Sequence, residues 1–493
     1  MGSENRVVNW GLAVLNVLAP AVVVWVVLEL AGKSVSDCLP VWGDEIWWWK
    51  QAEAVGVYGK PLGFWGYNGG RAQIGTYAAW GPAMVLPYGM FAFLFGWKYS
   101  SFVYANIFWE GIATAVYIKL TKVKQKGMVL LLAFQFFFVV KNYFLITAMA
   151  ECVRYSLGII AISFVYYVFS NEKCGPFFKY FFVPLYLVYI TQAYLIFGIF
   201  FLVYAACVFR IKRGAMYLKA AGTIGCFSVY MVLSKKILRL FCSPYPEYTQ
   251  TLPEKVYSNI KGIILIYQDG KIFFQWFLTV YLLVMAVLAV TLFYKRKCAK
   301  KKDQVLRLVS FLILSGFFWG HILFYNTTAW TFIRGLAVGM LLSFCILCLA
   351  DGQRVTVLFL LLIITGILVS AGVSETFINE NRFIDLDWQQ NLNMTRQTME
   401  NILVTDLETA DPWDHTVAAY ETAGLNLALA LPAGFALNAV LSENVYDNAK
   451  YAVVGKKLDQ KKERETVLKL LRTGYIVKYE DKRMAVLKKR AQP

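Results

Sequence analysis

The sequence predicts an all-α polytopic membrane domain followed by a small extracytoplasmic α/β domain at the C-terminus. Three observations carry this prediction: the composition, the recurrence of long apolar segments, and a change of character near residue 373. Of the 493 residues, 58% are hydrophobic, 17% are aromatic and only 16% are charged, and the mean hydropathy is +0.52. Soluble domains do not have this composition, so most of the chain must lie in lipid.

Apolar segments of spanning length recur along the first three quarters of the chain. A hydrocarbon core of ~30 Å needs roughly 20 such residues in a helix. The first segment, Trp10–Leu30, follows a start that is too short and too weakly basic for a cleaved signal, so we expect it to be an anchor. The other candidates are residues 77–97, 102–120, 128–147, 152–170, 178–192, 194–209, 216–234, 272–294, 305–325, 330–350 and 354–373.

The formal charge of +18 belongs to the membrane portion. Residues 374–493 hold 16 Lys and Arg against 17 Asp and Glu, whereas residues 1–373 hold 33 against 14. The nearly neutral tail offers no basic face to nucleic acid, so a nucleic-acid-binding function is excluded. In the membrane portion the basic residues cluster in short loops, which the positive-inside rule places in the cytoplasm: 122–126, 210–213 and 295–302.

The position of these basic loops tests how many segments cross. If all twelve crossed, every basic loop would lie outside. Residues 77–97 form the weakest candidate because Pro82 and Pro87 interrupt the helix. If this segment is juxtamembrane or re-entrant, about 11 transmembrane helices remain, the basic loops and the N-terminus are cytoplasmic, and the C-terminal domain is extracytoplasmic.

The chain then divides into two predicted domains. Residues 1–373 form the transmembrane domain, with a first external loop at 32–100 that contains juxtamembrane helices and a second at 240–271. Residues 374–493 read as an α/β domain because charged helical and strand-like stretches alternate there. Examples are the helix Gln460–Arg472 and the strands Tyr451–Val454 and Tyr475–Tyr479.

The first external loop brings two adjacent acids close to the membrane. Asp44 and Glu45 precede Trp47, Trp48 and Trp49, and tryptophan favours the membrane interface. Asp44 is therefore expected to begin a helix whose tryptophans lie at headgroup depth, where a carboxylate could meet a lipid-linked substrate. The alternative is that Asp44 is only a helix cap and Glu45 a solvated first-turn residue.

A second acid is expected on the same side. Glu151 and Arg154 lie one helical turn apart where the topology places an outer surface. They could form an ordinary i, i+3 ion pair. Because Glu151 and Asp44 share a compartment, the combination favours a site.

Basic residues on this side could bind a phosphate leaving group. The alternative for each is an anchor that snorkels at a helix end. Glu110 and His321 are ionisable groups within spans and receive no role. The predicted phosphate-binding set is Arg71, Lys141, Arg154, Lys235 and Arg334, with Lys236 and Arg239 nearby.

The order of these features resembles the GT-C superfamily of membrane glycosyltransferases, in particular its bacterial protein O-mannosyltransferase-like and aminoarabinose-transferase-like branches. The matching elements are Asp44-Glu45 after the first span, Gly81-Pro82 before the next apolar stretch, and Glu151 with Arg154. The resemblance covers roughly residues 10–373. The tail segments Asp411–Thr416 and Ala430–Phe435 look like extracytoplasmic domains appended to some bacterial members, which suggests acceptor recognition.

The resemblance implies an inverting transfer from a polyprenyl-phosphate sugar to an extracytoplasmic glycan, lipid or protein acceptor. Asp44 would be the general base, with Glu45 as its alternate and Glu151 as a second active-site acid. No cofactor is expected; some members use a divalent metal, which we do not predict here. Two alternatives stay open: a polysaccharide polymerase or ligase that uses a lipid-pyrophosphate oligosaccharide, and a lipid or solute transporter, which would place its acids at the midplane.

Overall fold

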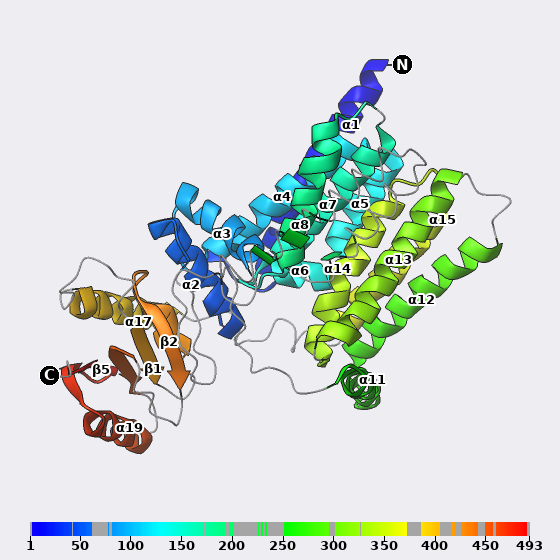
Figure 1. The fold of residues 1–493 in the computed structure, drawn as a ribbon. Helices are drawn as coiled ribbons and strands as arrows, with labels where there is room; N and C mark the ends of the chain where they lie inside the picture. The colour runs from blue at the N-terminus through cyan, green and yellow to red at the C-terminus, as the bar shows by residue number, and fades with distance from the viewer. Residues whose placement is uncertain are drawn as a thin grey trace.

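The computed structural model describes most of the chain, and it is predominantly helical (Figure 1). The described residues are 2–41, 43–61, 77, 81–171, 173–193, 197–198, 200, 225, 228–229, 232–233, 251–294, 301–325, 327–371, 386–404, 416–420, 425–441, 449–456 and 460–490. The predicted fold class, a helical membrane domain with a small C-terminal sheet, is confirmed.

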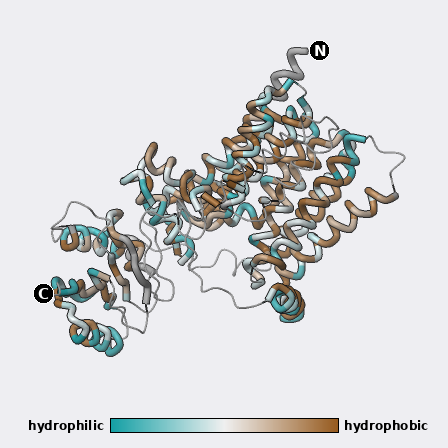
Figure 2. The backbone as a smooth tube through the Cα atoms, viewed as in Figure 1, coloured by the Kyte–Doolittle hydropathy of each residue, from teal (hydrophilic) through white to brown (hydrophobic). Residues whose placement is uncertain are grey.

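Long apolar helices form one bundle. Figure 2 shows hydrophobic residues along the bundle and hydrophilic residues concentrated in the C-terminal domain. The helices before residue 200 are α1 Gly2–Leu30, α2 Gly43–Tyr58, α3 Pro82–Phe95, α4 Ser101–Thr121, α5 Gln125–Phe137, α6 Val139–Leu145, α7 Glu151–Ser170, the π-helix Phe178–Phe182 and α8 Val183–Ala193. Those after residue 250 are α11 Leu252–Gln268, α12 Ile272–Tyr294, α13 Lys301–Phe324, α14 Ala329–Leu347 and α15 Arg354–Ala371.

One end of the bundle brings together the predicted cytoplasmic loop 122–126, the start of α13 and the turn before α15. Lys124 Nζ lies 2.6 Å from Asp351 Oδ1, which joins the loop after α4 to the turn before α15. Asp303, near the start of α13, accepts the N–H groups of Asp351 and Gly352 at 2.8 and 2.9 Å. Since α7 and α14 begin at the opposite end, the residues near their starts are separated from these loops by the length of the bundle.

Helix α3 is too short to cross alone. Its 14 residues span about 21 Å at 1.5 Å per residue, less than a ~30 Å hydrocarbon core. It packs against α2 where two glycines allow close approach: a Cβ on Gly56 would lie 2.6 Å from Ala92 Cβ, and one on Gly89 would collide with Val55. Residues 82–95 thus form a short helix packed on α2, and its juxtamembrane position stays a prediction.

The apolar segment predicted over residues 128–147 is broken into two helices, α5 and α6. The chain bends by 67° between α5 and α6, at Phe138. Asn142 Nδ2 donates to the Phe136 carbonyl at 2.8 Å, which satisfies one acceptor freed by the break. A polar side chain one turn beyond the bend therefore replaces a lost helical hydrogen bond.

Five helices within the described part of the chain are long and apolar enough to cross a membrane, or six if the bent pair counts as one. They are Trp10–Leu30, Glu151–Ser170, Ile272–Phe293, Lys301–Phe324 and Ala329–Leu347. The chain is thus multi-pass. Most of 216–234 and most of 194–209 lie outside the described residues, so the number eleven stays a prediction.

The C-terminal domain is an α/β unit built on one five-stranded sheet, with strand order β2-β1-β3-β5-β4. Strand β1 pairs in parallel with β2 and β3, whereas β5 pairs antiparallel with β3 and β4. The predicted helix and strands are confirmed as α19, β3 and β4. The elements are α17 Leu386–Met399, the π-helix Glu400–Val404, β1 Thr416–Tyr420, α18 Leu425–Ala430, β2 Ala436–Leu441, β3 Tyr451–Gly455, α19 Gln460–Arg472, β4 Tyr475–Glu480 and β5 Met484–Lys489.

Candidate active site

Glu151 is a fully buried acid at the first position of α7. Its Oε1 accepts from Arg154 Nη1 at 3.0 Å and from Arg334 Nε at 2.8 Å, and Arg334 Nη2 also lies 2.8 Å away. Its Oε2 is buried and has no hydrogen-bond partner among the described residues. One carboxylate oxygen is thus held by two arginines while the other is left to accept a hydrogen bond from a ligand.

Arg334 connects this buried acid to Asp44. Its Nη1 lies 3.7 Å from Asp44 Oδ2, a distance longer than a hydrogen bond. The Asp44 side chain is 38% exposed, against 13% for Arg334 and 0% for Glu151. Exposure therefore increases across the site, from a buried acid to a shared arginine and then to a carboxylate that solvent or a substrate can reach.

At the start of α2, the two adjacent acids of the first external loop have different partners. Glu45 is buried, and its Oε2 accepts the N–H of Val41 at 2.7 Å. This bond satisfies a main-chain donor just before the helix, which is the task of a capping side chain. Glu45 performs the capping that we expected of Asp44, and Asp44 is turned toward Arg334.

The surroundings of Asp44 strengthen it as a proton acceptor. Burial raises the pKa of the Asp44 carboxyl above its ordinary value; the positive charge of Arg334 opposes the rise and the negative charge of Glu151 adds to it. A carboxylate with a raised pKa is a stronger base. Asp44 thus combines exposure, basicity and an adjacent cation.

Asn106 of α4, which sequence reasoning did not single out, fixes the segment that leads to Glu151. Its side-chain amide donates to the carbonyls of Leu145 and Thr147 at 3.0 and 2.9 Å, and its Oδ1 accepts from the hydroxyl of Tyr88. Residues 146–150 connect α6 to α7, so this one buried side chain positions the start of α7. An asparagine inside an apolar segment was the available signal.

The remaining predicted phosphate-binding residues do not join this cluster within the described structure. Lys141 is buried in the bundle, where its Nζ lies 2.6 Å from Glu110 Oε2. This ion pair joins α6 to α4 and occupies the Lys141 ammonium. Arg71 and Lys235 lie outside the described residues.

A second buried charge cluster lies farther along α2. Glu53 Oε2 is 2.6 Å from Lys50 Nζ, and Glu53 Oε1 is 2.6 Å from Arg396 Nη2 of α17. Lys50 also donates to the main-chain carbonyl of Leu431, directly after α18. Burial lowers the pKa of Lys50 to about 8. These contacts attach α2 to the C-terminal domain, which lies beside it in Figure 1.

The three consecutive tryptophans belong to this packing. Trp47, Trp48 and Trp49 are all at least 94% buried in protein, so they are not exposed to lipid, and their predicted headgroup depth stays a prediction. Trp49 stacks on Tyr99 with ring centroids 5.2 Å apart, and the Arg396 guanidinium lies about 6 Å from both rings. The aromatic run serves protein packing next to the charge cluster.

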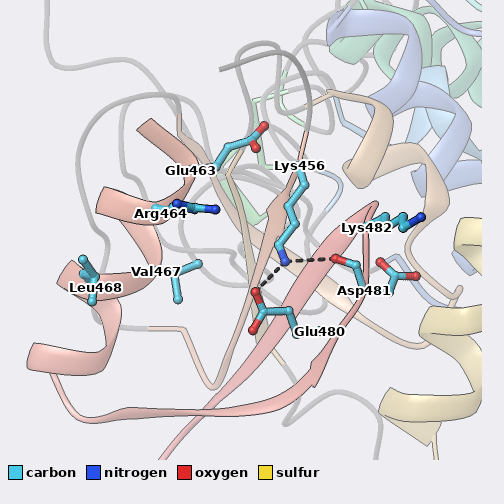
Figure 3. Close-up of a pocket in the computed structure, with 8 residues that line it drawn as sticks. All are labelled: Lys456, Glu463, Arg464, Val467, Leu468, Glu480, Asp481 and Lys482. Carbon is cyan, nitrogen blue, oxygen red and sulfur yellow. Dashed lines mark hydrogen bonds and ion pairs between the residues drawn. The ribbon is translucent and has the colours of Figure 1, made fainter. Parts of the chain in front are cut away.

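A separate cavity of 900 Å³ lies within the C-terminal domain, between α19 and the end of β4 (Figure 3). Lys456 crosses it to bind Glu480 and the carbonyl of Asp481. No residue of the acid–arginine cluster lines it. Within the described ranges, no group of three or more His, Cys, Asp or Glu side chains is arranged to hold a metal ion. The predicted tail segment 411–416 lies mostly outside the described residues.

Comparisons with known proteins give two similar solved structures. The apo form of the Archaeoglobus fulgidus oligosaccharyltransferase matches with a TM-score of 0.49 and 11% identity, over 91% of this chain and 69% of that chain. ArnT from Cupriavidus metallidurans bound to undecaprenyl phosphate matches with a TM-score of 0.40 and 10% identity, over 97% and 98%. No protein-family model and no curated protein sequence matches the chain. Similarity at this level decides neither the reaction nor the residues that perform it.

Proposed function

We propose that this chain is a GT-C-type membrane glycosyltransferase that transfers a sugar from a polyprenyl-phosphate-linked donor to an extracytoplasmic glycan, lipid or protein acceptor. One observation carries the proposal: the half-exposed Asp44 lies beside the buried Glu151–Arg334 pair at one end of the bundle. A base and a cation at the ends of spanning helices support the proposal, because the phosphate of a lipid-linked sugar would lie at the membrane surface.

Asp44 acts as the general base. Its carboxylate accepts the proton of the acceptor hydroxyl while that oxygen attacks the anomeric carbon and the bond from this carbon to the phosphate oxygen breaks. Attack from the face opposite the leaving phosphate inverts the anomeric carbon. The raised pKa of Asp44 suits this proton transfer, and its exposure leaves room for an acceptor.

Arginine offsets the charge that grows on the departing phosphate. Arg334 reaches the surface beside Asp44, and Arg154 lies behind it on Glu151. Guanidinium groups bind phosphate oxygens through paired N–H donors. Glu151 holds both arginines in place, and its Oε2 can accept a hydroxyl of the sugar or of the acceptor.

The position of the charges favours an enzyme over a transporter. Glu151 is the first residue of α7 and Arg334 lies in the second turn of α14, so the cluster lies at helix ends. A transporter would gather such groups near the midplane between paired broken helices. The Glu110–Lys141 pair does lie within the bundle, but its two charges are paired with each other.

The test is release of polyprenyl phosphate from a panel of polyprenyl-phosphate sugars by purified protein in nanodiscs. Asp44→Asn removes the base and keeps the size of the side chain. Glu45→Gln is the matched control because a glutamine oxygen can still accept the Val41 N–H. We expect Asp44→Asn to lose about 100-fold or more in rate, the contribution of a general base, and Glu45→Gln to keep most of it.

Each other outcome reassigns a role. Equal release by native protein and Asp44→Asn would leave Asp44 without a catalytic part. Loss in Glu45→Gln alone would move the base to Glu45. Absence of release across the panel, with folded protein, would favour the polymerase or ligase and the transporter.

A further inference from the structure

Helix α11 carries three separate faces. Taken at about 100° per residue, Asn259, Ile263 and Ile266 point toward the bundle and are buried or half-buried. A second stripe is apolar and exposed, and a third is exposed and mostly polar, with Leu265, 48% exposed, as its one apolar member. The apolar stripe is Tyr257, Ile260, Ile264 and Tyr267, with exposures of 70%, 39%, 50% and 42%; the polar stripe is Glu254, Ser258, Lys261 and Gln268.

The chain on either side of α11 fixes its depth. Gln268 ends α11, and the span α12 begins at Ile272, so three residues separate them, and the four steps from Gln268 to Ile272 reach at most about 14 Å. Asn259, in the middle of α11, donates to the carbonyls of Ile322 and Tyr325, both at 2.7 Å. These carbonyls lie at the end of the span α13. Two spans thus place α11 at the level where helices leave the hydrocarbon core.

The helix also lies across the spans. Figure 1 shows α11 end-on below the ends of α12 and α13, whose axes run in the plane of the view, and Figure 2 shows both hydrophobic and hydrophilic residues around it. A helix that lies in the membrane plane, packed on protein along one stripe, needs lipid on a second stripe and water on the third. The span α12 also exposes an apolar side chain at its start, Ile272 at 61%.

We infer that α11 is an interfacial helix that binds the bilayer surface on the side of Asp44, with Tyr257, Ile260, Ile264 and Tyr267 inserted among the acyl chains. One turn connects α11 to the helix that carries part of the candidate site. Asn259 Oδ1 accepts the N–H of Thr327 at 3.0 Å, next to Thr328, which caps the helix α14 that carries Arg334. The lipid surface and the phosphate-binding arginine are therefore joined by a short segment.

Spin labels test this binding without any donor or reaction, so the outcome is independent of the proposed transferase. Cysteines replace Tyr257, Ile264, Ser258 or Lys261 one at a time in the full chain. Each labelled protein is measured in phosphatidylcholine–phosphatidylglycerol nanodiscs by power-saturation electron paramagnetic resonance with oxygen and with a water-soluble nickel chelate. The labelled parent protein supplies the background from native cysteines. All four side chains are exposed, so the substitutions leave no cavity, and Ile260→Cys replaces any apolar-stripe variant that fails to fold.

We expect the ratio of oxygen to nickel accessibility to be several-fold higher at residues 257 and 264 than at 258 and 261, because oxygen concentrates in acyl chains and the chelate stays in water. Two outcomes overturn the inference. If residues 257 and 264 are inaccessible to both reagents, protein covers the apolar stripe. If they match residue 261, the stripe faces water.

Discussion

Glu53 is the residue whose loss should most weaken the attachment of the C-terminal domain to α2. The variant Glu53→Gln keeps the size of the side chain and removes its charge, which leaves Lys50 and Arg396 facing each other in the interior. Each lies 2.6 Å from a Glu53 oxygen, and at an effective dielectric constant of about 20 such a contact contributes about 6 kcal/mol of Coulomb energy. Desolvation and the mutual repulsion of the two cations offset much of this gain.

The net loss is set by the charges left behind. Breaking a buried ion pair by removing one partner costs about 3–5 kcal/mol. Lys50 limits the loss, because its pKa is already lowered to about 8 and it can release its proton when Glu53 is neutral. We therefore expect the lower end, about 3 kcal/mol, which is roughly a 100-fold change in an equilibrium constant.

Hydrogen exchange measures this attachment directly. In Glu53→Gln, amide protection in α17 and α18 should fall roughly 100-fold, while α13 and α14 keep theirs. Lys50→Met is the matched control: it leaves the Glu53–Arg396 pair intact and removes a donor from Glu53 Oε2 and from the Leu431 carbonyl. Because it leaves no two like charges facing each other, we expect a smaller loss, about 1–3 kcal/mol. If the two variants lose protection equally, or if Glu53→Gln loses none, the reasoning about the buried cluster is wrong.

Three further outcomes follow from the same contacts. Arg334→Gln removes the cation 3.7 Å from Asp44. With the screening proper to a half-exposed carboxylate, the lost charge interaction is about 1 kcal/mol. The pKa of Asp44 should therefore rise, and the acid limb of the kcat/KM profile should move up by about one pH unit. In Asn106→Leu, carbonyls at the start of α7 lose their donor, and thermal unfolding should show a loss of about 1–3 kcal/mol. The pKa of Lys50 is lowered from 10.5 to about 8, so between these pH values the unfolded state binds one more proton than the folded state. The stability of native protein relative to Lys50→Met should therefore rise from pH 8 to 10 in denaturant titrations.

The pattern of neighbouring residues was enough to predict some parts of the fold. The tail elements α19, β3 and β4 follow from charge periodicity and β-branched runs, which are properties of neighbouring residues. The topology placed Asp44, Glu151 and Arg334 on one side because the positive-inside rule depends only on where charges fall along the chain. The structure then brings all three into one cluster.

Other features depend on contacts that no local pattern contains. The bend between α5 and α6 occurs at Phe138 among apolar residues, without Pro or Gly, so hydrophobicity alone predicts a straight helix. Glu53 and Arg396 are 343 positions apart, and nothing in the residues next to either one indicates the other as its partner. The sequence likewise could not decide whether Asp44 or Glu45 is the candidate base. That depends on which of the two side chains points to Val41, and adjacent residues differ in side-chain direction.

The two charge clusters share one rigid element. Asp44 lies at the start of α2 and Glu53 nine residues later, about 14 Å along the helix axis. The first meets Arg334 of the bundle, and the second meets Arg396 of the C-terminal domain. A helix transmits displacement along its axis with little loss, so the attachment of the C-terminal domain bears on where the Asp44 carboxylate lies. We therefore expect the domain that lies beside α2 to help set the geometry of the candidate base.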